Sequence, residues 1–173
     1  MLTPRVQQKW EKPRHCVVKV NCDGAWNVQT MKGGYGWVIR DFVGMLQAGG
    51  NEDMRYGSAL IVEVDAIRAT VVACQQGGFS HIIVESDSLS AIQMVKRDSV
   101  VDVEVEGLLF DIHVVTRELQ EVTFMYAPRS CNTAAHEVAT FVYRNGGLFW
   151  WDFIPPEWLF NTLACEANVS VRL

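Results

Sequence analysis

Long apolar runs are missing from this chain of 173 residues. No stretch approaches the roughly 18 to 20 apolar residues of a membrane helix. Residues 1–14 are polar and contain proline, without the apolar centre that a signal peptide requires. We therefore expect a soluble intracellular protein of the nucleus or cytoplasm that does not enter a membrane.

Paired cysteines and an excess of basic residues are also missing. The five cysteines are odd in number and include no Cys-x-x-Cys, so the sequence predicts neither a disulfide framework nor a zinc site. The 15 Lys and Arg residues are outnumbered by 20 Asp and Glu residues, for a net charge of -5. Because phosphate neutralisation needs clustered cations, this charge argues against a protein that grips nucleic acid by charge alone.

Apolar residues, in contrast, are plentiful at 49% of the chain. This content is sufficient for one globular domain with a sizeable core. We expect that domain to cover residues 17–146. A mobile N-terminal arm, 1–16, should precede it, and an extension containing aromatic residues and proline, 147–173, should follow it.

The residue patterns predict an α/β domain with a mixed five-stranded sheet. The expected strands are 17–23, 33–40, 45–49, 81–85 and 121–126. The expected helices are 58–76, a short segment after residue 88, 103–118 and 131–144. The first three strands are close enough in sequence to form an antiparallel meander. The last two are separated by helices, so each must run parallel to a neighbour, with the helices on the faces of the sheet.

Three acidic residues occupy positions at which sheets of this kind often carry functional sites. Asp23 follows the first strand and Asp87 follows the strand at 81–85, and the ends of strands are common positions for functional groups. Glu63 is about 200° around its helix from Asp65, on the face expected to press on the sheet. A carboxylate buried there needs a cation or hydrogen-bond donors. A turn, a helix cap and a water-exposed edge are the ordinary alternatives for the three acids.

Five motifs, in this order, resemble the ribonuclease H-like superfamily, and more narrowly the plant ribonuclease H-like domains related to non-LTR retrotransposon polyproteins. The motifs are KVNCDGA at 19–25, GYGWVIRD at 34–41, Glu63 with Ala66, VESDS at 84–88, and RSCNTAAHEVA at 129–139. The resemblance implies a ribonuclease H-like fold. It also implies that the protein hydrolyses the RNA strand of RNA–DNA hybrids with two Mg²⁺ or Mn²⁺ ions.

The resemblance further implies roles for individual residues. Asp23 would bridge both metals, Glu63 would approach the metal on the leaving-group side, and Asp87 would complete the nucleophile side. His136 stands where active relatives usually supply a fourth acid, which makes it a further catalytic candidate. Contacts with nucleic acid are implied for Gly24, Ala25, Ser88 and Asn132.

Three departures from the family pattern leave two functions open. The imidazole of His136 should weaken a Mg²⁺ site, because Mg²⁺ prefers oxygen ligands. Residues 126–131 contain no histidine, and residues 100–106 are rich in acids where relatives carry a basic handle. An active or weakly active hybrid ribonuclease is favoured by the three intact acids. A catalytically impaired module for protein interaction or regulation is favoured by His136, the acidic charge and the aromatic segment 149–153.

Overall fold

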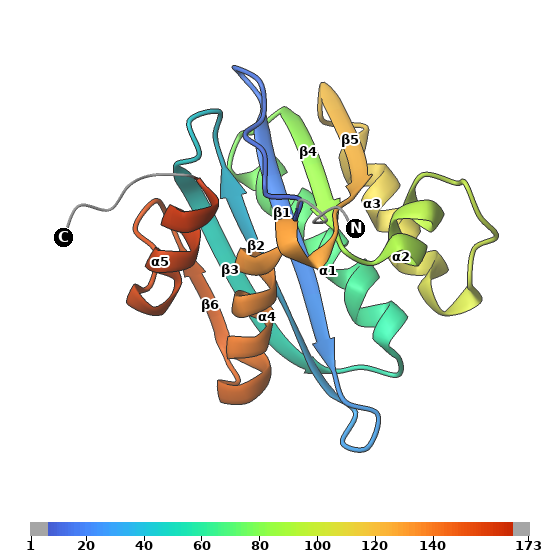
Figure 1. Ribbon diagram of the computed structural model, residues 1–173. Coiled ribbons are helices and arrows are strands. Elements are labelled where there is room, and N and C mark those ends of the chain that lie inside the picture. Colours follow the sequence, from blue (N-terminus) through green and yellow to red (C-terminus); the bar gives the residue numbers. More distant parts are fainter. Residues whose placement is uncertain (1–6, 168–173) are drawn as a thin grey trace, which may run out of the picture.

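The centre of the molecule is a mixed sheet of six strands in the order β5-β4-β1-β2-β3-β6 (Figure 1). The computed structural model describes residues 7–167. The strands are β1 (Val18–Trp26), β2 (Lys32–Arg40), β3 (Leu46–Arg55), β4 (His81–Ser86), β5 (Glu121–Tyr126) and β6 (Leu148–Trp151). The strands β1, β2 and β3 form the expected antiparallel meander, and β4 and β5 join it in parallel.

The sixth strand corrects the expected count of five. Strand β6 pairs antiparallel with β3, from Gly49 opposite Trp151 to Glu52 opposite Leu148. The sequence pattern missed it because four apolar residues after two glycines are too few to show a strand period. The sheet therefore continues past residue 146, and part of the extension at 147–173 belongs to it.

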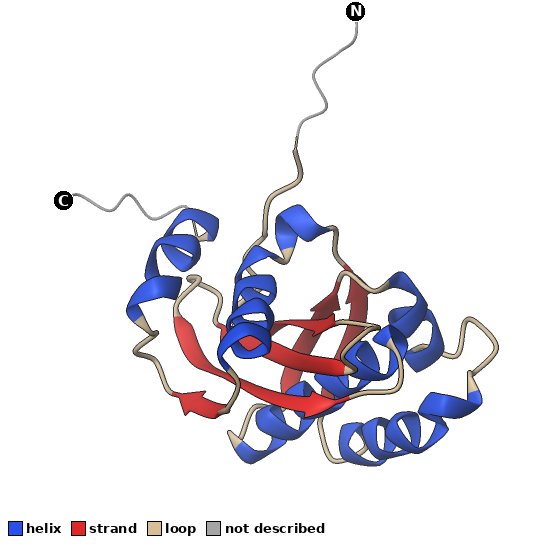
Figure 2. Ribbon diagram, turned by 90° about the horizontal axis from the view of Figure 1, so that it is seen from below, coloured by secondary structure: helices blue, strands red, loops and turns tan. Residues whose placement is uncertain are grey.

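Helices cover both faces of this sheet (Figure 2). Helices α1 (Ala59–Gln76), α2 (Leu89–Val95) and α3 (Glu106–Thr116) pack on one face, and α4 (Thr133–Asn145) and α5 (Glu157–Glu166) pack on the other. Two short 3₁₀ turns, η1 (Val103–Val105) and η2 (Arg129–Cys131), precede α3 and α4. Within residues 7–167, none of the helices combines the length and the apolar character that a membrane crossing requires.

Serine caps position the first two helices. The Ser58 hydroxyl accepts a hydrogen bond from the Ile61 N–H at 3.3 Å, and the Ser88 hydroxyl accepts one from the Ala91 N–H at 3.4 Å. Such caps satisfy backbone donors that the first turn of a helix leaves free. Helix α2 therefore starts directly after Asp87.

Helix α4 lies close to β2 because Gly36 has no side chain. A Cβ at this position would lie 2.5 Å from Val138 Cγ1 and 2.6 Å from the Ala139 backbone nitrogen. In the sheet, Gly36 is the antiparallel partner of Asp23. The glycine thus allows α4 to pack beside the strand position that carries this acid.

The segment around Trp10 corrects the expectation of a mobile N-terminal arm. Trp10 is only 5% exposed, and its ring lies 3.7 Å from the guanidinium carbon of Arg40. Burying an indole removes a large apolar surface from water, and the contact with a cation adds to the attraction. The part of the arm that the structure describes is therefore packed at Trp10, while residues 1–6 lie outside the described residues.

Arg40 belongs to a group of buried charges that we call the buried ion network. Its Nη1 lies 2.5 Å from Glu166 Oε2, and Lys19 Nζ lies 2.9 Å from Glu85 Oε1. Asn21 links the two pairs, because its amide donates to Glu85 at 2.9 Å and its oxygen accepts from Arg40 at 2.7 Å. Each acid in this network thus has a cation from the chain itself.

Candidate metal centre

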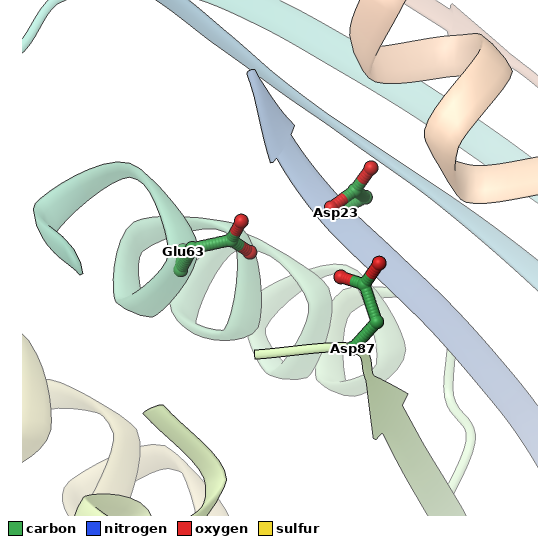
Figure 3. A group of neighbouring side chains, drawn as sticks. All are labelled: Asp23, Glu63 and Asp87. Atoms are coloured by element: carbon green, nitrogen blue, oxygen red, sulfur yellow. The ribbon is translucent and has the colours of Figure 1, made fainter. Parts of the chain in front are cut away.

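Three carboxylates meet at the edge of the sheet where β1 and β4 separate. Pairing between these strands ends at Cys22 opposite Ser86, and the next residue on each segment is Asp23 or Asp87. Glu63 reaches the same place from α1, and Figure 3 shows the three side chains directed toward one another. One oxygen of each carboxylate lies within 4.8 Å of the others. The structure therefore unites Asp23, Glu63 and Asp87, which we call the acid cluster.

Asp23 lies inside β1, which corrects the expected strand end at residue 23. Strand β1 continues to Trp26 because its antiparallel pairing with β2 continues there, with Asp23 opposite Gly36. Only the pairing with β4 ends at Cys22. The carboxylate is therefore anchored on a strand that keeps one neighbour, beside the gap where the other neighbour ends.

Gly24 brings α1 close enough for Glu63 to reach Asp23. A Cβ at Gly24 would lie 3.0 Å from Val62 Cγ1, a tighter contact than most side chains tolerate. The backbone N–H of Gly24 also acts to lower the pKa of Glu63, against the larger effect of burial. Gly24 therefore helps to position Glu63 through the close packing of α1 against β1.

The acid cluster contains buried oxygen atoms that lack hydrogen bonds. Among the residues that the structure describes, Asp23 Oδ1 and Glu63 Oε2 are buried without a hydrogen-bond partner. A buried polar atom without a partner lowers the free energy of unfolding. Carboxylate oxygens are the ligands preferred by Mg²⁺ and Mn²⁺, so the residues present fit such an ion.

Burial and mutual repulsion raise the pKa values of two acids in the cluster. The pKa of Asp23 rises from 3.8 to about 6, first because of burial and then because of the charge on Asp87, while contacts with His136 and Arg129 oppose the rise. Burial also raises the pKa of Glu63 well above its usual value, and the charges of Asp23 and Asp87 add to this effect. Without a further cation, the cluster therefore resists full ionisation.

His136 lies at the edge of the acid cluster, in the first turns of α4. Its Nδ1 is 2.8 Å from Asp23 Oδ2, and its side chain is 39% exposed. The adjacent Glu137 instead accepts a hydrogen bond from Thr162 in α5 at 2.7 Å. The imidazole of His136, not the carboxylate of Glu137, therefore faces the cluster.

Arg129 is the residue of this site that the sequence analysis did not select. In the turn η2, its Nε donates to Asp87 Oδ2 at 2.5 Å, and its Nη1 lies 2.7 Å from His136 Nδ1. Its Nη2 is 4.0 Å from Asp23 Oδ2. Burial acts to lower the pKa of Arg129, but the hydrogen bond to Asp87 and the surrounding carboxylates raise it. In the sequence it was only the first residue of the motif at 129–139, and nothing assigned it a role.

The four residues implied in nucleic-acid contact differ in their surroundings. Gly24, Ala25 and Ser88 are half-buried close to the acid cluster. Asn132 is fully buried, and its amide donates to the backbone oxygen of Cys22 at 2.9 Å. The Asn132 side chain therefore links β1 to the start of α4, and a contact of this residue with nucleic acid stays a prediction.

Sequence comparison matches residues 21–142 to the reverse transcriptase-like family. The chain therefore belongs to this family, and the predicted membership is confirmed. Curated proteins, in contrast, include no match to the chain. The narrower resemblance to plant domains stays a prediction.

Solved structures of ribonucleases H share the fold. The N-terminal RNase H domain of rv2228c from Mycobacterium tuberculosis is 17% identical, with a TM-score of 0.70 over 75% of this chain and 94% of that chain. RNase H1 from the halophilic archaeon Halobacterium salinarum is 19% identical, with a TM-score of 0.70 over 75% and 99%. LC11-RNase H1, isolated from compost and solved with an RNA/DNA hybrid, is 17% identical, with a TM-score of 0.68 over 74% and 97%. The ribonuclease H-like fold predicted from the motifs is thus confirmed.

Proposed function

We propose that this protein is a metal-dependent ribonuclease that cleaves the RNA strand of RNA–DNA hybrids. The observation that carries the proposal is the convergence of Asp23, Glu63 and Asp87, with two buried oxygens that the described residues do not satisfy. Membership of the reverse transcriptase-like family and the shared fold support it. The structure of LC11-RNase H1 with an RNA/DNA hybrid supports the choice of substrate.

The three carboxylates would hold two divalent ions, Mg²⁺ or Mn²⁺. Such ions, when bound, supply an activated water and stabilise the leaving oxygen of a phosphodiester. The chain contributes the placement of the ligands: Asp23 is anchored on β1, Glu63 on α1 and Asp87 before the cap of α2. The imidazole of His136 adds a nitrogen beside these oxygens, so Mn²⁺ should support activity better than Mg²⁺.

The substrate would lie across the edge of the sheet that carries the acid cluster. Gly24, Ala25 and Ser88 stand beside the carboxylates and would contact its backbone. The 2′-hydroxyl group beside each RNA phosphate is the feature by which such a site distinguishes RNA from DNA. The compartment that we propose for this activity is the nucleus or cytoplasm.

A cleavage assay with Mg²⁺ and with Mn²⁺ tests the proposal. The substrate is an RNA–DNA hybrid labelled on either strand, and the controls are duplex DNA and duplex RNA. We expect cleavage of the RNA strand of the hybrid alone, abolished by Asp23→Asn and by Asp87→Asn. The matched control is Glu137→Gln, which alters an acid beside the site that points toward Thr162. Failure of the wild-type protein to cleave with either metal would overturn the proposal.

A protein-interaction module is the second candidate, favoured by the apolar edge of the sheet. Strand β6 is the last strand in the sheet, and Leu148, Phe149 and Trp150 are 72%, 48% and 53% exposed. An apolar edge strand is a template for pairing with a strand of another chain. A wild-type protein that shows no cleavage, but whose mass in light scattering is lowered by Trp150→Lys, would favour this function.

A further inference from the structure

Arg129 places a positive charge against the carboxylates that would bind a divalent ion. Its guanidinium lies within hydrogen-bond distance of Asp87 and His136 and 4.0 Å from Asp23. The Asp87 oxygen that it contacts is Oδ2. An oxygen that accepts a hydrogen bond from a guanidinium is less available to a metal, and a metal nearby repels the guanidinium.

We infer that Arg129 is an internal counter-ion of the acid cluster, which competes with divalent ions for Asp87 and so sets the ion concentration at which the site fills. This inference rests on the proposed function, because it takes the cluster to be a metal site. The carboxylate of Asp87 exchanges one cation for another: it leaves the guanidinium when a divalent ion binds. Without an ion, the guanidinium offsets the repulsion among the three acids.

The exchange requires only a side-chain movement. The Arg129 side chain is 54% exposed, so its guanidinium can move into water. The backbone below it is held by the turn, in which the Asn132 N–H donates to the Arg129 oxygen at 3.0 Å. The start of α4 therefore keeps its place while the side chain changes partners.

The same contact determines the hydrogen bond that His136 makes. Its Nδ1 is 2.7 Å from Arg129 Nη1 and 2.8 Å from Asp23 Oδ2. One ring nitrogen cannot accept from Arg129 and donate to Asp23 at the same time. When Arg129 leaves, Nδ1 of His136 is free to donate to Asp23 or to bind an ion through its lone pair.

Calorimetric titration with Mn²⁺ alone, in the absence of nucleic acid, measures this competition. We expect Arg129→Ala to lower the dissociation constant for Mn²⁺ by about three- to tenfold, because a half-exposed ion pair is lost and a nearby positive charge is removed. The matched control is Arg14→Ala, which removes the same charge from the Arg14–Glu121 pair at the opposite end of β5. The control should change the constant by less than about twofold.

Three further outcomes separate this inference from the proposed function. Equal or weaker Mn²⁺ binding by Arg129→Ala overturns the inference alone. If neither the wild type nor Arg129→Ala binds Mn²⁺, the acid cluster is not a metal site, and both proposals are overturned. If Arg129→Ala fails to fold, Arg129→Gln removes the charge but keeps a shorter polar side chain with two N–H donors, and a shift of the constant in the same direction is expected.

A double-mutant cycle tests whether the effect passes through Asp87. In metal-free buffer we expect Arg129→Ala to lower the melting temperature by about 2–4 °C. In a protein that already carries Asp87→Asn, the same substitution should cause a shift smaller by half or more, because the partner charge is gone. Equal shifts in both backgrounds would show that Arg129 does not act on Asp87.

Discussion

Two groups of buried charge meet the start of α4, and they are built differently. In the buried ion network, Arg40 pairs with Glu166 and Lys19 with Glu85, and Glu166 also accepts a hydrogen bond from the Ala134 N–H at 3.3 Å. Acids and cations are equal in number there. In the acid cluster, three carboxylates share a half-exposed guanidinium and an imidazole. Among the described residues, only the acid cluster thus combines an excess of acids with buried carboxylate oxygens that lack a partner.

The difference separates charges that are neutralised within the chain from charges that are not. A buried acid with its own cation is already neutralised, and removing either partner leaves the other unpaired. A buried acid without one is destabilising until a cation arrives from solution. Four substitutions alter one group, the other group or the link between them, in order of decreasing expected effect.

Arg40→Met should have the largest effect, because it leaves Glu166 buried without a cation. We expect the free energy of unfolding to fall by about 3–5 kcal/mol. Urea denaturation of the metal-free protein measures the change. The control is Arg14→Met, which breaks an exposed pair and should change the free energy by no more than about 0.5 kcal/mol. A loss of less than about 1 kcal/mol in Arg40→Met would mean that the two groups do not differ as described.

Asp23→Asn should instead raise the stability of the metal-free protein at neutral pH. The folded state raises the pKa of Asp23 from 3.8 to about 6, so it holds a proton more tightly than the unfolded state does. The wild type therefore loses stability as the pH rises from about 4 to about 6, and the variant lacks this loss. The expected gain at pH 8 is about 1–3 kcal/mol.

Thermal unfolding in a chelator at pH 4, 6 and 8 measures this gain, which should be smallest at pH 4. Addition of Mn²⁺ should then stabilise the wild type more than the variant. A melting temperature that falls in Asp23→Asn at pH 8 would show that this acid holds the fold.

Asn132→Ala tests the link between the two groups. The Asn132 side chain bonds to Asn21 of the buried ion network and to the Cys22 backbone beside Asp23. Its loss leaves buried polar groups without partners, so we expect the free energy of unfolding to fall by about 1–2 kcal/mol. Mn²⁺ affinity should fall as well, because the support of Asp23 is weakened. Asn145→Ala, at the exposed end of α4, is the matched control.

His136→Asp should have the smallest effect, a change of metal preference. A fourth carboxylate favours Mg²⁺ over the present imidazole, so the ratio of activity with Mn²⁺ to activity with Mg²⁺ should fall by about two- to fivefold. The added charge should also lower the stability of the metal-free protein. Rates measured with each metal test the first effect, with Glu137→Gln as the neighbouring control. An unchanged ratio would show that His136 does not contact the ions.

The order of the elements from β1 to α4 and the acid cluster could be predicted because their signals are local. The periodic spacing of apolar residues, the cap residues and the glycines predict the strands β4 and β5 and the helix α1. The predicted bounds differ from the observed bounds by one residue at most. Glu63 was identified from its angle around the helix. Asp87 was identified because parallel strands end at a common edge.

Other features depend on contacts that no local pattern contains. Arg40 and Glu166 are 126 positions apart, and only the packing of α5 brings them together. Asp65 lies about 200° around α1 from Glu63, away from the face expected to press on the sheet, yet it is 4% exposed because it accepts hydrogen bonds from Tyr56 and Arg68. The long side chain of Arg129 extends toward the acid cluster, and the sequence does not specify this direction.

The missing side chain at Gly36 determines how closely α4, which carries His136, can approach the acid cluster. A Cβ there would lie 2.5 Å from Val138 Cγ1, whereas ordinary contacts begin at 3.4 Å. Any other residue would therefore shift α4, and with it His136, outward by about 1 Å, a displacement that can lower a catalysed rate by about a hundredfold. Gly36, which has no side chain of its own, thus limits how His136 is aligned with the acid cluster.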